Sequence, residues 1–317
     1  LGALVGMGFC VRMVVDQNRF EAAIEAGDEA RVRALLDAKP SLVDYRKTGK
    51  RGVVYYRPLT EAARAGHTRV VALLLDRGAD INATSLYGTA LKEGIDHPDV
   101  VALLLSRGAA VGTPDARGRT ALHGAGYDGA TTRLLIDKGA DVNARDRDGR
   151  TPLHDQSNRF TPESTVELCA HGADPAARDA AGRTPAALTD STRAPWLSPG
   201  GTCERLSARF RKEGNVPPAV AKAALNELRC AVLPRQMKTH EYPLAQNMMA
   251  WSCADLGRAH EEGDGVDKDY PRALELYAIA CGGGEKWACD RRGVLTAWIG
   301  EHPGWLASQA RATAKNQ

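Results

Sequence analysis

The side chains that could perform chemistry in this 317-residue chain are its histidines, carboxylates and cysteines. His154 and Asp155 are adjacent, and a histidine oriented by an aspartate is part of many nucleophilic catalytic sites. However, no motif places a serine or cysteine nucleophile beside them. Asp264 and Asp267 lie in a glycine-rich segment that lacks the alternating oxygen ligands of a calcium loop. We therefore predict no catalytic residues.

Spacings typical of bound metals and cofactors are also missing from the sequence. It contains no Cys-x-x-Cys pair, no His-x-x-x-His pair and no phosphate-binding glycine loop. We therefore expect no metal and no cofactor, and we predict that the chain is not an enzyme. The seven cysteines are unevenly distributed, since five of them fall in the last third of the chain: Cys203, Cys230, Cys253, Cys281 and Cys289. This distribution indicates that the two parts of the chain differ in kind.

The overall charge is close to balanced, with 42 basic and 39 acidic residues and a net charge of +3. This balance predicts no general affinity for nucleic acid or for an anionic membrane. A chain of this length is expected to form about two domains. The opening residues 1–11 are apolar and are either the end of a secretion signal or a first helix. A signal of this kind is the only membrane association that we expect.

Two short phrases recur along the first two thirds of the chain and stay in register with each other. A Gly-Ala phrase starts at Gly78, Gly108, Gly139 and Gly172, at intervals of 30, 31 and 33 residues. A Gly-Arg-Thr phrase starts at Gly118, Gly149 and Gly182. A period of this length with two phrases in register predicts a solenoid of stacked units. Solenoids present extended binding surfaces, so we look for function first in binding.

Each repeated unit is expected to contain a turn followed by two short helices. In the clearest unit Gly149 marks the turn, and Thr151 and Pro152 are typical of a helix start. A second helix is predicted over 162–170, ending at Gly172 in left-handed geometry. Helices this short are not stable alone in water. They must bury their apolar faces against the neighbouring units.

These motifs resemble the ankyrin repeat. The resemblance rests on Thr151-Pro152-Leu153-His154, Thr120-Ala121-Leu122-His123, Gly66-His67 and the Gly-Ala phrases, and it covers about residues 16–196. It implies an all-α solenoid of about five units and a partial sixth, each with a hairpin and two antiparallel helices. It also implies that His123 and His154 bond the backbone between units. Protein–protein recognition through hairpin tips and concave helices is the expected function.

The segment 45–57 is longer than the family spacing. Gly49 and Gly52 permit a tight turn and residues 53–56 favour a strand, so we predict a protruding hairpin with basic and aromatic tips. Tyrosine and arginine are enriched at interface hot spots. The predicted partner contacts are Tyr45, Arg46, Lys50, Arg51, Tyr55, Tyr56 and Arg57. The alternative is a solvated loop whose tyrosines cover the end of the domain.

Further partner contacts are expected at positions that vary in the family pattern: Lys92, Tyr127 and Asp155, with Glu93 and Gln156 beside them. The second and third units lack the motif histidine, with Arg57-Pro58-Leu59-Thr60 and Gly88-Thr89-Ala90-Leu91 in its place. Arginines also recur at the hairpins and would form a row in a stacked array. Such a row could meet an acidic protein surface, but local neutralisation by neighbouring aspartates is the interpretation we favour.

A proline- and glycine-rich break ends the periodic region, and we place a linker at 197–202. Helices are predicted over 203–213, 217–233, 244–262, 271–281 and 285–299, forming a region 203–300 before a tail at 301–317. A cysteine-three-residues-glycine motif occurs at Cys253/Gly257 and again at Cys289/Gly293. With its small residues, this region is similar to the Sel-one-like repeat, a relative of the tetratricopeptide repeat.

In the cysteine-bearing members of that group, the cysteine ending one helix bonds the cysteine opening the next. The resemblance implies a disulfide between Cys281 and Cys289 and offers Cys230 and Cys253 as a second pair. The alternative is reduced, half-buried thiols. Cys169 and Cys203 have no obvious partners. Disulfides would place the protein outside the reducing cytoplasm, so we favour a periplasmic or secreted location over a cytoplasmic one.

The function predicted from these features is a non-enzymatic adaptor. An ankyrin array would recognise a folded protein, and a short α/α Sel-one-like module would follow it. One alternative is a cell-wall-ligand site or hydrolase-like pocket in the carboxy-terminal helices. Another is a protective partner for a toxin. No nucleic acid and no small-molecule cofactor are expected as partners.

Overall fold

The computed structural model describes residues 16–125, 129–158, 162–189, 194–236 and 243–302. The chain divides into two compact units. Unit 1 comprises Leu1–Leu168 and Ala176–Leu188, and unit 2 comprises Cys169–Pro175 and Thr189–Gln317. The predicted domain boundaries, 16–196 and 203–300, stay predictions.

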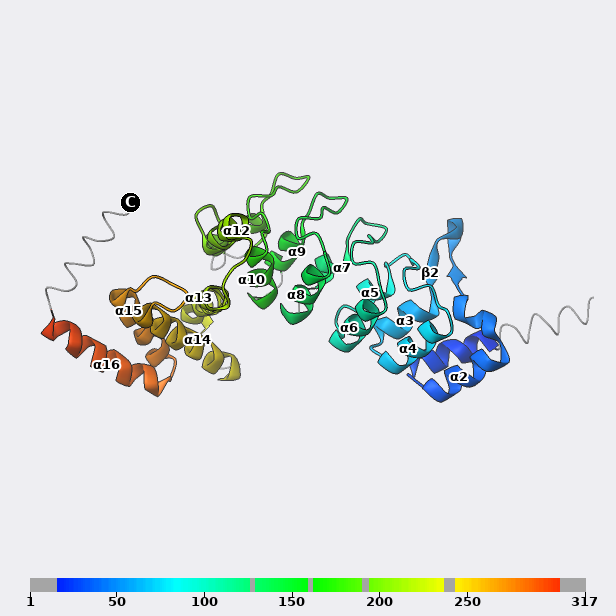
Figure 1. Cartoon of the computed structure of the whole chain (residues 1–317), viewed down its shortest axis with the longest axis horizontal. Coiled ribbons are helices and arrows are strands. Elements are labelled where there is room, and N and C mark those ends of the chain that lie inside the picture. The colour runs from blue at the N-terminus through cyan, green and yellow to red at the C-terminus, as the bar shows by residue number, and fades with distance from the viewer. Residues whose placement is uncertain (1–15, 126–128, 159–161, 190–193, 237–242, 303–317) are drawn as a thin grey trace, which may run out of the picture. The chain divides into compact units, whose positions relative to one another are not determined.

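Unit 1 is a series of helix pairs, so the predicted all-α solenoid is confirmed (Figure 1). The first pair is a helix over 16–25 followed by α2 (Glu29–Ala38). The next pairs are α3 (Pro58–Arg64) with α4 (Thr68–Asp76), α5 (Ala90–Glu93) with α6 (Pro98–Ser106), α7 (Ala121–Gly124) with α8 (Gly129–Asp137), and α9 (Pro152–Asn158) with α10 (Pro162–Ala170). The 3-10 turn η3 (Pro185–Leu188) takes the place of a sixth first helix.

The helices stack by their position in the repeat. The first helices α3, α5, α7 and α9 contact each other in sequence, and η3 contacts α9; α2, α4 and α6 form the second row. Apolar residues repeat where these rows meet, with Val70, Leu74, Val100 and Leu104 fully buried. Burial of each such side chain is worth about 1.5–3 kcal/mol, which is how helices too short for independent stability persist.

The predicted hairpin in segment 45–57 is present. After the 3-10 turn η1 (Pro40–Asp44), strand β1 (Lys47–Thr48) pairs antiparallel with β2 (Val54–Tyr56), and η2 (Lys50–Gly52) connects them. Gly52 adopts a φ of +73°, a left-handed conformation that glycine tolerates at little cost. The hairpin projects away from the helices of unit 1 (Figure 1).

The glycines that open the repeated Gly-Ala phrase end the second helices, as predicted. Their φ values are all positive: +86° at Gly78, +85° at Gly108, +89° at Gly139 and +88° at Gly172. Side chains with a Cβ rarely adopt this conformation, so glycine recurs at each helix end.

Unit 2 is helical throughout its described part. Its helices are α11 (Ala194–Leu197), α12 (Thr202–Glu213), α13 (Pro218–Gln236), α14 (Pro243–Glu262), α15 (Tyr270–Gly282) and α16 (Lys286–Glu301). The five helices predicted after residue 202 agree with α12–α16 to within three residues at each end. Helices α13, α14, α15 and α16 pack consecutively. A Cβ at Gly257 would lie 2.7 Å from the Tyr277 ring, so the small residue permits the close approach of α14 and α15.

Six of the seven cysteines form three pairs at disulfide distance within unit 2. Cys281 lies near Cys289 and Cys230 near Cys253, with Cα–Cα distances of 4.8 and 4.9 Å. The third pair is Cys169 with Cys203, at 5.1 Å. These distances lie inside the usual range for disulfides. Sequence reasoning found no partner for either member of the third pair, because the two lie on unlike helices 34 positions apart.

Within the residues that the structure describes, no helix is both long enough and apolar enough to cross a membrane. In the same ranges, no group of three or more histidine, cysteine or carboxylate side chains is arranged to hold a metal ion. Cys10 and the predicted contact Tyr127 lie outside the described residues.

Candidate functional site

Exposed large apolar side chains gather on two loops of unit 1. They are Val53 (43% exposed), Tyr55 (41%), Leu86 (41%) and Tyr87 (54%), and we call these four residues the hairpin patch. Among the described residues of unit 1, no other large apolar side chain is as exposed. Val53 and Tyr55 come from the β1–β2 hairpin, whereas Leu86 and Tyr87 form the tip of the loop before α5. Exposed apolar side chains gathered in this way are typical of interaction sites.

The two loops that carry the hairpin patch are bonded to each other. The backbone N–H of Leu86 donates to the carbonyl of Val54 at 2.6 Å. The Arg57 guanidinium donates through Nε to the carbonyl of Thr84 at 3.0 Å. These two bonds join segments about 30 residues apart in the sequence, so the patch is formed before any partner arrives.

The loop that bears Tyr87 is also held by a side chain of α5, Lys92. Lys92 donates through Nζ to the Tyr87 carbonyl at 2.7 Å and forms an ion pair with Asp115 at 3.1 Å. Hydrogen bonds from the backbone of Arg119 and Arg117, and from Lys92, outweigh burial and lower the pKa of Asp115. The Lys92 side chain is only 10% exposed, which corrects its predicted role as a partner contact. It positions the exposed tyrosine instead.

The base of the β1–β2 hairpin is packed against unit 1. The Tyr45 and Tyr56 rings lie 5.8 Å apart, and Lys47 lies over the Tyr56 ring while it bonds Glu21. Burial and the nearby Glu21 carboxylate raise the pKa of Tyr45 to about 12. Tyr56 is only 7% exposed, so it supports the hairpin from inside and is removed from the predicted contacts. The interpretation that tyrosines of this segment cover the end of the domain therefore applies to Tyr56, whereas Tyr55 faces solvent and is available to a partner.

The surface around the hairpin patch is basic. Segment 45–57 contains five basic residues and no acidic residue. Arg46 and Lys50 are exposed, whereas Arg57 is half-buried in its bond to Thr84. Arg51 lies in η2, at the turn of the hairpin.

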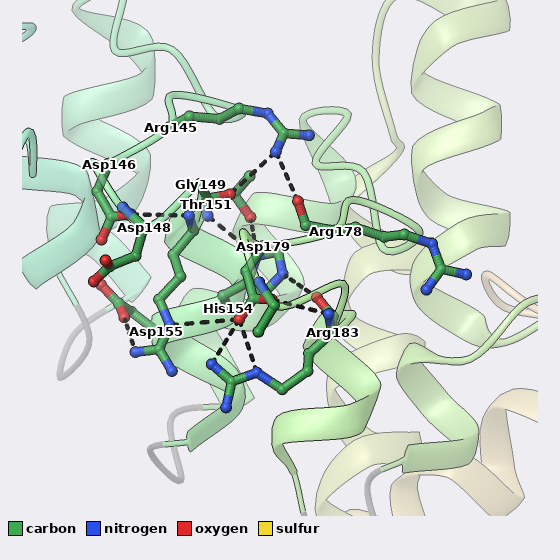
Figure 2. Close-up of polar contacts among 12 residues, drawn as sticks. Arg145, Asp146, Asp148, Gly149, Thr151, His154, Asp155, Arg178, Asp179 and Arg183 are labelled. Atoms are coloured by element: carbon green, nitrogen blue, oxygen red, sulfur yellow. Dashed lines mark hydrogen bonds and ion pairs between the residues drawn. The ribbon is translucent and has the colours of Figure 1, made fainter.

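The two motif histidines connect successive repeats, as the resemblance implies. His154 donates through Nε2 to the carbonyl of Arg183 at 3.1 Å, and its Nδ1 accepts from the Thr151 backbone and hydroxyl at 3.1 and 2.9 Å (Figure 2). Burial lowers the pKa of His154 and favours this neutral form. His123 makes the equivalent bonds to Thr120 and Arg150. Both rings are fully engaged within unit 1.

The hairpin arginines are occupied in connecting neighbouring repeats. Figure 2 shows Arg145 donating through Nη1 to the carbonyls of Gly149, at 3.1 Å, and Arg178, at 2.8 Å. Arg178 makes the next such bond, to the Gly182 carbonyl at 2.8 Å. These guanidinium groups hold backbone within the stack.

Aspartates neutralise other members of the arginine row. Asp179 is paired with Arg183 at 2.8 Å, and its side chain is only 1% exposed. Burial alone would raise the pKa of Asp179, but hydrogen bonds from the backbone and side chain of Arg183 hold it below its usual value. Asp115 pairs similarly with Arg119 at 3.6 Å. In these two pairs the charge of the arginine is balanced by a neighbouring aspartate.

Asp155 was predicted to contact a partner, and its position corrects that prediction. Its side chain is 13% exposed and lies 3.8 Å from Arg150. Burial raises the pKa of Asp155. The carboxylate therefore belongs to the interior of the array, close to the network in Figure 2.

Unit 2 has a groove of about 860 Å³ lined by α12, α13, the end of α14 and the start of α15. Its polar groups already have protein partners. Arg205 donates to the Thr202 hydroxyl at 2.6 Å and lies 3.5 Å from Glu227, and His260 Nδ1 bonds the Asp267 carbonyl at 3.1 Å. No serine or cysteine is among the described residues that line the groove.

Leu86 and Tyr87 were missed by sequence reasoning. The signal was present, because the equivalent hairpin tips are Ala116-Arg117, Arg147-Asp148 and Ala180-Ala181, whereas this tip is Leu86-Tyr87. Two large apolar residues at a solvated turn have no packing role to explain them.

Comparison with known families agrees with this geometry. Residues 86–179 match the family described as ankyrin repeats (3 copies), and residues 56–86 match a single ankyrin repeat. The chain therefore contains ankyrin repeats over 56–179. Neither match extends into the region predicted to be Sel-one-like.

Curated relatives share the ankyrin region only. A protein named probable E3 ubiquitin-protein ligase XBOS33 from Oryza sativa subsp. japonica is 37% identical over 127 residues, 39% of this chain and 24% of the relative. E3 ubiquitin-protein ligase XBAT33 from Arabidopsis thaliana is 38% identical over 116 residues, 35% of this chain and 22% of the relative. The chain thus spans about a quarter of the length of these relatives.

The prediction that the chain is not an enzyme is corrected by these relatives. Proteins named E3 ubiquitin-protein ligases are enzymes, and they are about 37% identical to this chain where the two align. Missing nucleophiles and metal spacings in this chain give no information about activities that reside in other parts of a longer protein.

Proposed function

We propose that unit 1 recognises a protein partner through the hairpin patch. The observation that carries this proposal is the position of Tyr55 and Tyr87, two exposed aromatic side chains on loops that are bonded to each other. Ordering of mobile loops is one of the main costs of association, and here the loops are already ordered. Tyrosine adds a large contact area with only two rotatable side-chain bonds.

Recognition of a protein is also compatible with the activity named for the relatives. A ubiquitin ligase must hold a protein substrate, and a preformed ankyrin surface would suit that task. This use is a proposal about the longer protein to which such a region would belong, and it rests on the relatives' names alone.

Site-specific photo-crosslinking in cells tests the proposed surface. A photoreactive amino acid replaces Tyr87 in one variant and Trp251 in another, because Trp251 is an aromatic residue of unit 2 that is at least as accessible (68% exposed, against 54% for Tyr87). We expect a discrete protein adduct from position 87, no matching adduct from position 251, and loss of the first adduct when Tyr55→Ala is added. The same adducts from both positions, or an adduct that survives Tyr55→Ala, would contradict the proposal.

We also propose that the chain folds in an oxidising compartment, in the periplasm or outside the cell. The support is the three cysteine pairs at disulfide distance in unit 2. Alkylation of native protein before and after reduction, followed by mass spectrometry, tests this proposal. We expect the six paired cysteines to be labelled only after reduction, and labelling of all six beforehand would overturn it.

We also propose that unit 2 is a Sel-one-like repeat region. It is supported by the consecutive packing of α13–α16 and by cysteines at both the end of α15 and the start of α16. The unit would provide a second docking surface. Deletion of residues 203–317 should then weaken partner retention without abolishing the adduct at position 87, and loss of that adduct would show that unit 2 carries the recognition.

A further inference from the structure

We infer that the partner docks on the hairpin patch through an acidic protein segment with an apolar residue at its centre. This inference rests on the proposed function and specifies the chemistry of the partner. It follows from the exposed cations on the hairpin that carries part of the patch and from the absence of carboxylates in segment 45–57.

Most cations of the array are committed to groups within it. Arg183 pairs with Asp179 at 2.8 Å, Arg119 with Asp115 at 3.6 Å, and Lys92 with Asp115 at 3.1 Å. On the hairpin itself, Lys47 is bonded to Glu21 and Arg57 to a carbonyl. These groups are engaged in stabilising the fold.

Arg46 and Lys50 are not paired in this way, and they lie on the hairpin segment that carries Val53 and Tyr55, unlike the other exposed cations of unit 1 such as Arg69 and Arg117. Both are exposed, and within the described part of the chain neither forms an ion pair. They precede Val53 and Tyr55 on the same hairpin segment, which has no carboxylate of its own. A partner that places its carboxylates opposite these two cations gains attraction without breaking any bond of the array. Such rim charges chiefly raise the association rate and set specificity.

The apolar centre of the surface distinguishes a protein segment from other polyanions. Tyr87 and Leu86 are 54% and 41% exposed and lie on the second loop, and their backbone is held by Lys92 and Val54. A partner that covers these side chains removes apolar area from water, and this contributes a binding free energy of about 25 cal/mol for each Å² that is buried. A nucleic-acid backbone has little apolar surface with which to cover them. An acidic peptide that contains a leucine, phenylalanine or similar residue satisfies both features.

Selection from a random peptide library tests this inference with the full chain as bait. Clones that bind the chain are counter-selected on the Tyr55→Ala/Tyr87→Ala variant, so that only patch-dependent peptides remain. We expect these peptides to be enriched in aspartate and glutamate around one apolar residue. Their affinity should fall at least tenfold when the salt concentration is raised from about 50 to 500 mM, because exposed charges are screened at high salt.

Charge reversal provides the matched control. Arg46→Glu/Lys50→Glu should weaken the selected peptides at least tenfold, and Arg211→Glu/Lys212→Glu should leave the affinity within twofold. The control pair makes the same change in net charge at two exposed positions in α12 of unit 2. All four positions are exposed, and thermal unfolding of each variant confirms that the fold is retained.

The outcomes separate the inference from the proposed function. Patch-dependent peptides that lack acidic residues and bind independently of salt would overturn the inference and leave the proposed function intact. Failure to obtain any peptide that discriminates against Tyr55→Ala/Tyr87→Ala would overturn both. Binding to vesicles of 70% phosphatidylcholine and 30% phosphatidylserine that is lost in Arg46→Glu/Lys50→Glu, without peptide binding, would replace the protein segment by a lipid surface.

Discussion

Units 1 and 2 are both made of short packed helices, but different interactions hold them together. In unit 1 the same hydrogen bonds recur from one repeat to the next: His123 and His154 each bond the backbone of the following hairpin. In unit 2 the cross-links are individual, with three cysteine pairs and a buried carboxylate. A regular repeat allows the same hydrogen bond to recur between successive units, whereas an irregular helical unit needs a different interaction between each pair of helices.

The buried carboxylate of unit 2 is Glu261. It accepts from the Tyr277 hydroxyl at 2.8 Å and from Arg291 through Nε at 3.0 Å, with a second contact to the same guanidinium. Burial and the bond to Glu261 raise the pKa of Tyr277. One side chain thereby joins α14, α15 and α16. In unit 1 the helices are joined instead by bonds that recur at the same position of each repeat.

Reduction of the cysteine pairs is the strongest way to separate the two units. A disulfide is typically worth about 2–4 kcal/mol, so reduction of all three pairs should unfold much of unit 2. Helices α3–α8 of unit 1 contain none of these cysteines and should be unaffected. Hydrogen exchange measured with and without reductant should show faster exchange in α12–α16 and at the end of α10, where Cys169 lies. Equal acceleration in α3–α8 would contradict the comparison.

Removal of one repeat-to-repeat bond should destabilise unit 1 by a smaller amount. His154→Ala removes a fully buried side chain, the acceptor of the Thr151 amide and one of the two donors to the Arg183 carbonyl, and we expect a loss of about 2–4 kcal/mol in the free energy of unfolding. His97→Ala is the control, because that half-buried ring makes one such bond, to the Arg64 carbonyl. Chemical denaturation measures both variants, and an equal cost for the two would be inconsistent with this account.

Loss of the Glu261 charge should lower the free energy of unfolding of unit 2 by a smaller amount than His154→Ala lowers that of unit 1. Glu261→Gln keeps the shape but removes the charge opposite Arg291, and we expect a cost of about 1–2 kcal/mol. Glu275→Gln is the matched control, because its pair with Arg272 is exposed and should contribute less than about 0.5 kcal/mol. Denaturation monitored by tryptophan fluorescence compares the two variants. A null effect of Glu261→Gln would mean that the cysteine pairs alone determine the stability of unit 2.

Acidification should affect unit 1 through His154. Burial depresses the pKa of this histidine below its ordinary value of 6.5, so the unfolded chain binds the proton more readily than the folded one. The stability contributed by the neutral ring is complete above pH 6.5 and declines as the pH falls below it. Denaturation midpoints between pH 7.5 and 5.5 should therefore decrease in the wild type and less so in His154→Gln. Parallel decreases would assign the effect to other groups.

The smallest effect on stability should come from the hairpin patch. Tyr55 and Tyr87 are largely exposed, so Tyr55→Ala/Tyr87→Ala should change the free energy of unfolding by no more than about 0.5 kcal/mol per site. Thermal melting checks this value. A loss of several kcal/mol would indicate that the tyrosines serve the fold rather than a partner.

Much of the fold was predictable because it depends on local signals. The Gly-Ala phrases fixed the helix ends, and the motif histidines His123 and His154 lie where the resemblance placed them. The Cys169–Cys203 pair was not predictable, because its two helices belong to different sequence patterns. Periodicity identifies elements within a repeated unit, but it does not indicate where a repeat meets something unlike it.

The candidate site was predicted less well than the fold. Lys92, Asp155 and Tyr56 were chosen by residue type and repeat position, and all three are largely buried. Polar and aromatic residues at repeat junctions serve equally well as internal cross-links, and sequence alone does not give their exposure. Leu86 and Tyr87 carried the clearer signal, since two large apolar residues occupy a turn that is small or charged in the other repeats.

The central claim is that recognition occurs on the hairpin patch. It is tested most directly by hydrogen exchange of the full chain with and without a saturating patch-dependent peptide. We predict slower exchange confined to residues 45–57 and 83–89, with unit 2 unchanged. Protection centred on α12–α16, or on the helices of the array without the hairpins, would contradict the claim.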